Sequence, residues 1–434
     1  MSRMLKKMAV RSGLARLDAE VRRRLGSDYF YLRMYSGDVL SAPVSDLELL
    51  ENLERAVKTA AAGDVTGEVT GEVTREVIDL SQGIPDLSGI FDASPILESM
   101  TRSAALASSL RAYPAGFGHP EALRSVAGKI KSDTGVSYDP EKEILICNGA
   151  SQALAHALEC FTDAGETIVL FDPCYLFYPW LARTRGLRVR RVRGPNPQNG
   201  RLNQKELDRA MRGAKAIIVN SPGNPDGRVI HPDDLALVAA LAARNNCVII
   251  SDEVYSAFCW KRPHESIATI PAARDRTIVV SSVSKSHGLP GLRAGWCAGP
   301  AQLIRPLAML MSIRVPCVSA ATQVMMPALL DAESAFAARR HTEFLARRKN
   351  AIHAANAAGF HAPNPDGAFY IWTEIPDRFR SGYEFARWCL ETCRVAVMPG
   401  EPSGPSGQGK VRWSFGVSPE KFNAAMSRVR ATTR

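Results

Sequence analysis

The chain contains 434 residues, of which 46% are hydrophobic and 23% charged, a composition typical of a globular enzyme with two domains or one large domain with appendages. The formal net charge is +10, but Lys and Arg are spread along the whole length, which favours anionic small molecules as ligands over nucleic acid. No apolar run reaches the roughly 18 residues of a membrane-spanning helix, so we expect no membrane segment.

Nine cysteines are scattered through apolar segments, without a C-x-x-C pair or the paired His residues of a zinc site. This pattern predicts buried thiols in a reducing compartment and no bound metal. The first residues are basic but lack a secretory apolar core, and Asp18 and Glu20 argue against an organelle transit peptide. We therefore expect a cytoplasmic protein.

The first part of the chain is predicted to be an N-terminal extension, residues 1–77. Leu and Val residues recur at helical spacing over 14–25 and 45–60, and Ser45 with Glu48 forms a capping-box pattern at the start of the second helix. Residues 64–77 repeat a four-residue pattern rich in Gly and Thr, which predicts a flexible or weakly ordered linker.

Short apolar runs then alternate with helical stretches. A short strand is expected within 78–87, and a Gly/Pro-rich loop at 111–124 leads into a helix at Glu121. The apolar runs are 144–147, 167–171, 216–219, 247–250 and 277–280, with helices that include 151–161 and 232–243. Wholly apolar strands alternating with helices predict an α/β fold with a mostly parallel sheet covered on both faces. Strands at 367–374 and 411–416 indicate a smaller α/β unit.

Polar residues follow these strands, at the edge where ligands bind in open α/β sheets. After the first, the N–H groups of Ala150 and Ser151 and the Ser151 hydroxyl can bind a phosphate, or they form a simple helix cap. After the second, Tyr175 or Tyr178 could stack on a flat heterocycle or pack in the core. After the third, Asn224 lies between two prolines and could donate to a phenolate oxygen or serve only as a turn residue.

The last two strands lead to the residues with the most distinctive chemistry. Asp252 and Tyr255 follow the fourth strand, where a buried carboxylate is costly unless it meets a cation such as a protonated pyridine. Lys285 follows the fifth strand; its amine can form a Schiff base, or it is an ordinary surface lysine. The nearby groups that can bind phosphate oxygens are Ser282, Ser284 and Arg293.

Over residues 78–434 the sequence resembles the class I/II aminotransferases, fold-type I pyridoxal-phosphate enzymes related to aspartate aminotransferase. The motifs that carry the resemblance are N-S-P-G-N-P-D-G (220–227), S-D-E-V-Y (251–255), S-V-S-K-S-H-G-L-P-G-L-R-A-G (282–295) and V-R-W-S-F (411–415). The resemblance implies a large pyridoxal-phosphate-binding domain over 111–315 with a mostly parallel, helix-covered sheet. It also implies a smaller α/β domain built from 78–110 and 316–434.

The resemblance also implies roles for individual residues. Lys285 would form the Schiff base with pyridoxal 5'-phosphate, Asp252 would pair with the ring nitrogen, and Tyr175 would stack on the ring. Asn224 and Tyr255 would hold the ring oxygen. The phosphate would be bound by Ala150, Ser151, Ser282, Ser284 and Arg293.

For the substrates, the resemblance implies an L-amino acid that donates its amino group to a 2-oxo acid. Arg412 would clamp the substrate α-carboxylate, with Asn224 and the backbone of Gly83 as further contacts. Tyr113 matches the tyrosine that reaches the phosphate of the neighbouring subunit in this family, which implies a homodimer with shared sites.

Three positions depart from the family pattern, and two other functions stay open. Asp226 replaces a usual Thr, His287 stands where an aromatic residue is common, and Trp413 follows the arginine in place of a small aliphatic residue. One alternative is a lyase or cyclase of the same fold, similar to aminocyclopropane-carboxylate synthases or β-lyases. The other, suggested by the basic extension, is a transcription regulator with an aminotransferase-like domain.

Overall fold

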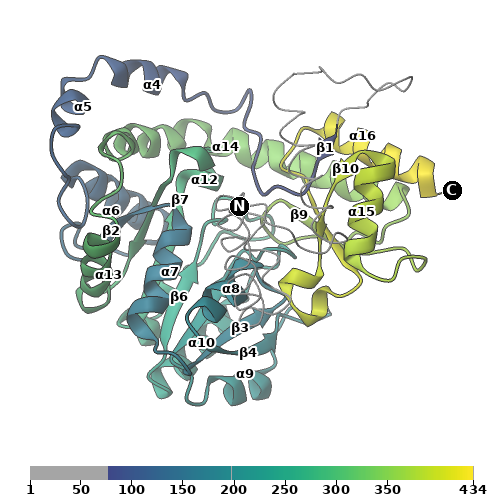
Figure 1. Ribbon diagram of the computed structural model, residues 1–434, viewed down its shortest axis with the longest axis horizontal. Coiled ribbons are helices and arrows are strands. Elements are labelled where there is room, and N and C mark those ends of the chain that lie inside the picture. Colours follow the sequence, from purple (N-terminus) through teal and green to yellow (C-terminus); the bar gives the residue numbers. More distant parts are fainter. Residues whose placement is uncertain (1–76, 197, 434) are drawn as a thin grey trace, which may run out of the picture. The chain divides into compact units, whose positions relative to one another are not determined.

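The computed structural model describes residues 77–196 and 198–433, and residues 78–434 form one compact unit (Figure 1). The helices expected at 14–25 and 45–60, and the repeat at 64–77 apart from its last residue, lie outside the described residues. Among the helices that the structure describes, none is long and apolar enough to cross a membrane.

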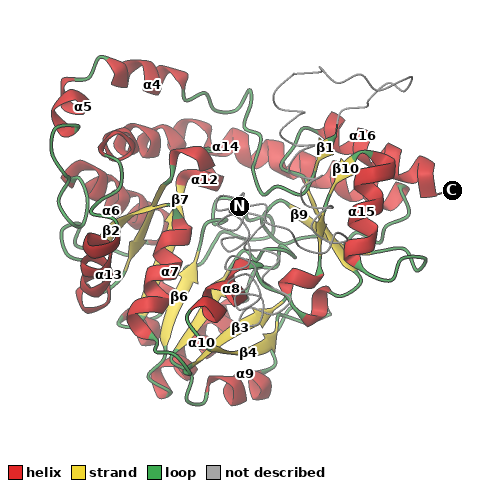
Figure 2. Ribbon diagram, viewed as in Figure 1, coloured by secondary structure: helices red, strands yellow, loops and turns green. Residues whose placement is uncertain are grey.

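A seven-stranded sheet forms the centre of the larger part of this unit, with strand order β2-β8-β7-β6-β5-β3-β4 (Figures 1 and 2). Its strands are β2 (Ile144–Asn148), β3 (Thr167–Asp172), β4 (Arg188–Arg193), β5 (Ala216–Asn220), β6 (Val248–Asp252), β7 (Thr277–Ser282) and β8 (Ala294–Ala298). All run in one direction except β8, which is antiparallel to both neighbours. The predicted mostly parallel sheet is confirmed.

Helices cover this sheet on both faces, which explains why its central strands are continuously apolar. In β3, Ile168 and Leu170 pack into the hydrophobic core on one face, while Val169 and Phe171 pack into the core on the other. Because neither face of the sheet is exposed to solvent here, these strands have no need of polar side chains at alternate positions. The helices of this part are α6 (Pro120–Thr134), α7 (Ala150–Phe161), α8 (Phe177–Thr184), α9 (Gln204–Met211), α10 (Pro232–Arg244), α11 (Pro271–Arg274), α12 (Val283–Ser286) and α13 (Ala301–Arg314).

Two strands of this sheet carry no apolar run and were missed by the sequence analysis. The edge strand β4 reads R-V-R-R-V-R, and its exposed arginines protect an edge that would otherwise be free to pair. Strand β8 reads A-G-W-C-A, in which Trp296 is surrounded by small residues, and its Gly295 packs directly against the backbone of Gly149 and Ala150.

A smaller antiparallel sheet, with strand order β11-β12-β9, belongs to the C-terminal part. Its strands are β9 (Tyr370–Glu374), β11 (Met398–Pro399) and β12 (Lys410–Ser414), and a separate parallel pair joins β1 (Ile78–Asp79) to β10 (Val395–Ala396). The remaining helices are α4 (Ser94–Thr101), α5 (Ala104–Ser109), α14 (Ala320–Ala357), α15 (Gly382–Cys393) and α16 (Pro419–Thr433). The pairing of β1 with β10 places the start of the described chain beside its C-terminal part.

The long helix α14 connects the two parts. Near its start Met326 and Leu330 belong to the core of the large sheet, whereas Phe336, Phe344 and Ala351 belong to the core of the small sheet. One continuous helix of 38 residues therefore contributes side chains to both cores.

We predict that Gly295→Ala destabilises the fold. A Cβ at this position would lie 2.6 to 2.8 Å from backbone atoms of Gly149 and Ala150, which a flexible side chain cannot relieve. Such overpacking costs about 1–3 kcal/mol, so the thermal unfolding midpoint followed by circular dichroism is expected to fall by a few degrees. Gly291→Ala is the matched control, since no described atom lies within 4 Å of a Cβ there. Equal midpoints for the two variants would contradict the packing argument.

Candidate active site

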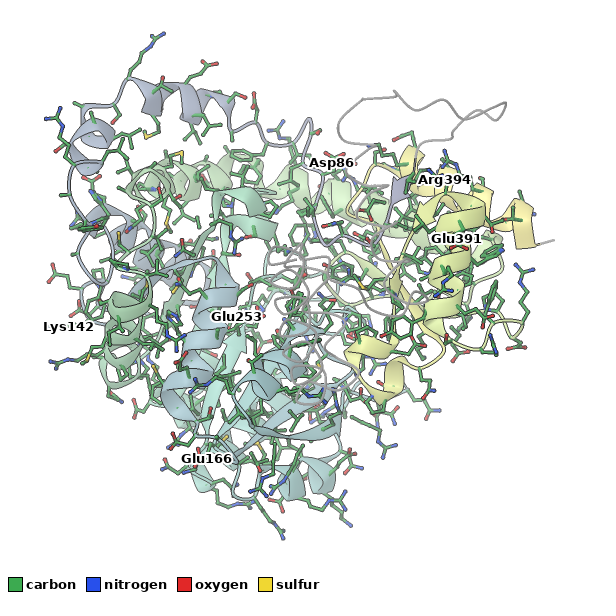
Figure 3. The ribbon with its side chains drawn as sticks, in the orientation of Figure 1. Asp86, Lys142, Glu166, Glu253, Glu391 and Arg394 are labelled. Carbon is green, nitrogen blue, oxygen red and sulfur yellow. The ribbon has the colours of Figure 1, made fainter. Side chains whose placement is uncertain are left out.

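The polar residues singled out after the strands gather at one edge of the large sheet. Strands β5, β6 and β7 are parallel neighbours, with Asn220 opposite Asp252 and Asp252 opposite Val280. Their carboxyl ends therefore lie side by side. Asp252 ends β6, Asn224 lies in the turn after β5, and Lys285 lies in α12 directly after β7. Figure 3 draws the side chains and labels Glu253, the residue directly after the end of β6.

At one end of this edge, the start of α7 and Arg293 form an anion site. Helix α7 begins at Ala150 after Gly149, whose φ of 76° is left-handed, and the first N–H groups of a helix have no partner within it. The Arg293 guanidinium donates to the carbonyls of Asn148 and Pro290, each at 2.9 Å, and fills the space that a Cβ on Gly149 would need. Backbone donors and a cation thus converge on one spot.

Of the two serines predicted to bind phosphate, Ser282 ends β7 next to this anion site, and Ser284 follows in α12. Ser282 is paired with Gly295, the residue that packs against Gly149 and Ala150. Ser282 and Ser284 are buried, whereas Ser151 and Arg293 are exposed, so the site has a closed inner side and an open outer side.

At the centre of the edge, Lys285 and Asp252 have strongly perturbed titration. The partly buried Lys285 amine donates to the carbonyl oxygen of Gly83 at 2.7 Å. Burial, together with the positive charge of Arg412, lowers the pKa of Lys285 to about 8. Burial raises the pKa of Asp252 to about 6, against the opposing effect of a 2.5 Å hydrogen bond from the Tyr178 hydroxyl. The amine therefore loses its proton far more easily than a surface lysine.

On the other side of Lys285, four side chains form a connected polar cluster. Arg412 donates from Nη1 to Asn224 Oδ1 at 2.7 Å and from Nη2 to the carbonyl of Ser81, while its buried Nε has no partner among the described residues. The Asn224 amide donates to the Tyr255 hydroxyl at 3.4 Å. The Tyr255 hydroxyl also lies 2.7 Å from that of Tyr370.

Two residues of this site were not assigned these roles from the sequence. The sequence indicates that the Tyr178 ring stacks on a heterocycle or packs in the core, but its hydroxyl donates to Asp252. The sequence does not single out Tyr370, because an aromatic residue in the strand G-A-F-Y-I-W is typical of a core position. The sequence could have indicated Tyr178 as a site residue, because it lies three residues after Tyr175 in the segment that follows β3.

Other predicted residues have distinct surroundings. Tyr175 is half-buried with its ring edge-on to Tyr178, the centroids 5.4 Å apart. Tyr113 is 82% exposed, in contrast to the buried cluster. Gly83 contributes its carbonyl to Lys285.

The three departures from the family pattern face away from this cluster or are neutralised. Trp413 donates from Nε1 to Thr373 and packs in the core of the small sheet. His287 is buried with its ring edge-on to Phe336 and accepts or donates at both nitrogens. The buried carboxylate of Asp226 pairs with Arg228 at 3.3 Å.

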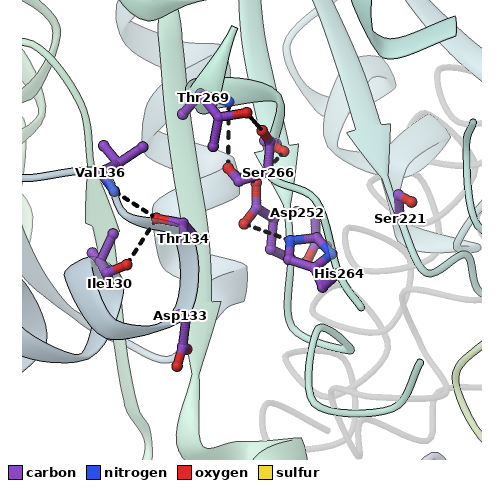
Figure 4. A network of polar contacts seen from close by, with 12 residues as sticks. Ile130, Asp133, Thr134, Val136, Ser221, Asp252, His264, Ser266 and Thr269 are labelled. Atoms are coloured by element: carbon purple, nitrogen blue, oxygen red, sulfur yellow. Dashed lines mark hydrogen bonds and ion pairs between the residues drawn. The ribbon is translucent and has the colours of Figure 1, made fainter. Parts of the chain in front are cut away.

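A network on the other side of β6 fixes the backbone that carries Asp252 (Figure 4). Glu253 accepts hydrogen bonds from Ser251 at 2.8 Å and Ser266 at 2.6 Å, and its other oxygen lies 2.9 Å from His264 Nε2. Burial alone would lower the pKa of His264, but the neighbouring Glu253 raises it to about 10. The resulting ion pair ties the loop after β6 to the end of the strand.

Helix α14 supports α12, the short helix that carries Lys285. Arg340 donates from Nη1 to the carbonyl of Ser286 at 2.7 Å and pairs with Glu333 at 2.8 Å. Glu333 also pairs with Lys129 of α6 at 2.7 Å. Burial would raise the pKa of Glu333, but these two cations lower it to about 2, so the network stays charged across the working pH range.

Comparisons with known proteins identify the family of the chain. The profile of the family described as aminotransferase class I and II matches residues 75–429. The chain belongs to this family. It is 32% identical to the aspartate aminotransferase of Pyrococcus abyssi over 362 residues, which cover 82% of this chain and 92% of that relative.

Two solved structures show the same relationship in three dimensions. The aromatic aminotransferase from Pyrococcus horikoshii is 30% identical, with a TM-score of 0.76 and coverage of 88% of this chain and 98% of that chain. The N-succinyldiaminopimelate aminotransferase from Mycobacterium tuberculosis is 27% identical, with a TM-score of 0.78 and coverage of 90% and 100%. The predicted family, fold-type I architecture and enzyme class are confirmed: the chain is an aminotransferase, and its family implies pyridoxal phosphate as the cofactor.

We predict that the amine of Lys285 in the cofactor-free protein reacts with pyridoxal 5'-phosphate at a rate that rises with pH and reaches half its maximum near pH 8, since only the uncharged amine is nucleophilic. In Arg412→Leu the midpoint is expected to move to higher pH, because a charge that opposes protonation of Lys285 is gone. Stopped-flow absorbance measures both rates, and Lys285→Ala supplies the background. A midpoint at the ordinary value of 10.5 would contradict the effect of burial and of Arg412 on Lys285.

Proposed function

We propose that this aminotransferase moves the amino group of an L-amino acid to a 2-oxo acid with pyridoxal 5'-phosphate bound at Lys285. The observation that carries the proposal is the central cluster, in which an amine with a pKa of about 8 lies among a buried carboxylate, Asp252, and a buried guanidinium, Arg412. An amine that only forms a structural ion pair does not need a lowered pKa. An amine that acts as a general acid and base does.

The described residues fit the cofactor at both of its ends. At the phosphate end, the Arg293 guanidinium lies beside Gly149. The first N–H groups of α7 and this cation can therefore bind the same anion. The phosphate ligands we propose are Ala150, Ser151, Ser282, Ser284 and Arg293. At the ring end, Asp252 is a buried acid whose only described side-chain hydrogen-bond donor is Tyr178, and a protonated pyridine nitrogen would supply the cation it lacks.

The remaining cofactor contacts follow from the polar cluster. We assign Asn224 and Tyr255 to the ring oxygen, because both offer a donor beside Lys285, and Tyr175 to stacking on the ring. When bound, pyridoxal phosphate supplies an aldehyde for the amine and a ring that withdraws electrons from the substrate α carbon.

Four residues of the chain then bind and process the substrate. Arg412 binds the α-carboxylate through its paired N–H groups and orients the α C–H bond towards Lys285, with Asn224 and the backbone of Gly83 completing the pocket. Lys285 takes the α proton and later returns it, a role for which a pKa of about 8 is suited because both forms of the amine are populated near neutral pH.

We also propose a homodimer in which Tyr113 reaches the phosphate of the neighbouring site. Tyr113 is exposed together with other large apolar side chains on α4, α13 and the segments next to α5 and α13, which are Leu97, Leu110, Met309, Ile313 and Val315. Exposed apolar side chains of this number mark a surface that a second copy would cover.

The domain division and the compartment stay proposals as well. The separate cores of the large and small sheets support a large domain over 111–315 and a small domain made of 78–110 and 316–434, with residues 1–77 as an extension. All nine cysteines lie in the described range and carry free thiols, which supports the cytoplasm. The charge distribution favours small anionic substrates and gives no support for a nucleic-acid partner.

We predict that the purified protein with pyridoxal phosphate shows a visible absorbance band that Lys285→Ala abolishes. A panel of amino acids containing aspartate, the aromatic amino acids and N-succinyldiaminopimelate, which the relatives' names suggest, is expected to include a donor that bleaches the band and an oxo acid that restores it. Arg412→Lys should raise the KM of that donor at least about tenfold, since a single ammonium cannot bind a carboxylate bidentately. Release of ammonia in place of amino transfer would instead support a lyase or cyclase.

The shared site predicts complementation between two defective variants. In a dimer of one Tyr113→Ala and one Lys285→Ala subunit, one of the two sites keeps both residues, so a refolded equal mixture regains about a quarter of the wild-type sites. Activity is measured after mixing in denaturant and refolding, with each variant refolded alone as the control. A mixture no more active than the average of the two separate variants would refute the shared site.

A further inference from the structure

We propose that Tyr370 is a positioning residue that couples the cofactor-binding Tyr255 to the substrate-binding Arg412. The inference rests on the proposed function, because it concerns the same site. Tyr370 is fully buried at the start of β9, in the small sheet, while Tyr255 follows β6 of the large sheet. It therefore connects groups that belong to different sheets.

The hydroxyl of Tyr370 contacts that of Tyr255. Its oxygen lies 2.7 Å from that of Tyr255, a distance that requires one proton between the two atoms. If Tyr255 gives its single proton to the ring oxygen of the cofactor, the proton in the 2.7 Å contact must come from Tyr370. The Asn224 amide donates to the same Tyr255 oxygen, so this oxygen then accepts twice and donates once. Tyr370 thereby fixes the direction in which Tyr255 donates.

The ring of Tyr370 contacts the guanidinium of Arg412. In the pairing of β12 with β9, Tyr370 is opposite Ser414, two residues from Arg412 and on the same face, and the Arg412 Cζ lies 4.3 Å from the ring centroid. The face of an aromatic ring attracts a guanidinium and limits its rotation. This contact holds Arg412 in the orientation that reaches Asn224 at 2.7 Å.

Gly83 lies against the hydroxyls of both Tyr370 and Tyr255. A Cβ on Gly83 would collide with the Tyr370 hydroxyl oxygen, so only glycine lets Tyr370 reach Tyr255 while the Gly83 carbonyl accepts from Lys285. Tyr370 is thus packed against the backbone that holds the catalytic amine as well as against Tyr255 and Arg412.

The two parts of the Tyr370 side chain can be separated by substitution. Tyr370→Phe keeps the ring under Arg412 and removes the hydroxyl, so Tyr255 becomes a weaker donor to the cofactor oxygen. Less negative charge is then stabilised on that oxygen, and the pH midpoint of the visible band is expected to move upward by part of the shift seen in Tyr255→Phe, with KM nearly unchanged. Tyr370→Leu also removes the ring and should raise the KM of the donor amino acid about tenfold.

The experiment is a pH titration of the visible band of each holoenzyme, accompanied by kcat and KM for one donor. Trp413→Phe is the matched control, because it removes a buried hydrogen bond on the same small sheet, to Thr373, and its side chain packs into the core. It should lower the thermal midpoint without moving the band. Should Tyr370→Phe not fold, Gly83→Ala, which displaces the hydroxyl, is expected to shift the band in the same direction.

The outcomes separate this inference from the proposed function. A wild-type protein without a visible band would overturn both. A wild-type band that shifts in Tyr255→Phe but not in Tyr370→Phe would overturn the role of the hydroxyl alone. An equal KM in Tyr370→Phe and Tyr370→Leu would overturn the role of the ring.

Discussion

Partial burial of one amine is the constraint on which the site depends. A charged Lys285 is disfavoured by burial and by Arg412, and Asp252 offsets only part of this effect. The amine is therefore readily available as a nucleophile and base, while the protein retains a guanidinium nearby for an anionic substrate. The same burial leaves Asp252 with a raised pKa, which a cationic partner would lower. In both groups burial shifts the pKa towards the uncharged form, and a neighbour or ligand of opposite charge shifts it back.

The fold meets this constraint by bringing separate strand ends to one edge. Parallel strands β5, β6 and β7 deliver their following turns side by side, and the antiparallel β8 between β7 and β2 brings Arg293 to the start of α7. Gly295 allows this close approach, because it adds no Cβ between β8 and Gly149. The small sheet then supplies Arg412 and Tyr370 from the other side.

The sequence predicts five strands of the large sheet and singles out most residues of the candidate site, because the relevant signals are local. Apolar runs mark the central strands, and chemistry-bearing residues follow them directly. The signals fail where a role depends on pairing between distant segments: Tyr178 meets Asp252, 74 residues away, and Tyr370 meets Tyr255, 115 residues away. Strand β4 was missed because an edge strand needs charge more than apolar side chains. The role assigned to Tyr113 involves a second chain, which the fold of one chain does not test.

The long helix α14 has a consequence for how the protein loses its structure. It contributes to the cores of both sheets, and its Arg340 holds the carbonyl of Ser286, next to Lys285. Melting of the C-terminal half of this helix would release that carbonyl at the same time as the core of the small sheet. Because one helix contributes to both cores, we expect the two cores to unfold together. The segment that carries Lys285 would then lose its support in the same step as β12, which carries Arg412.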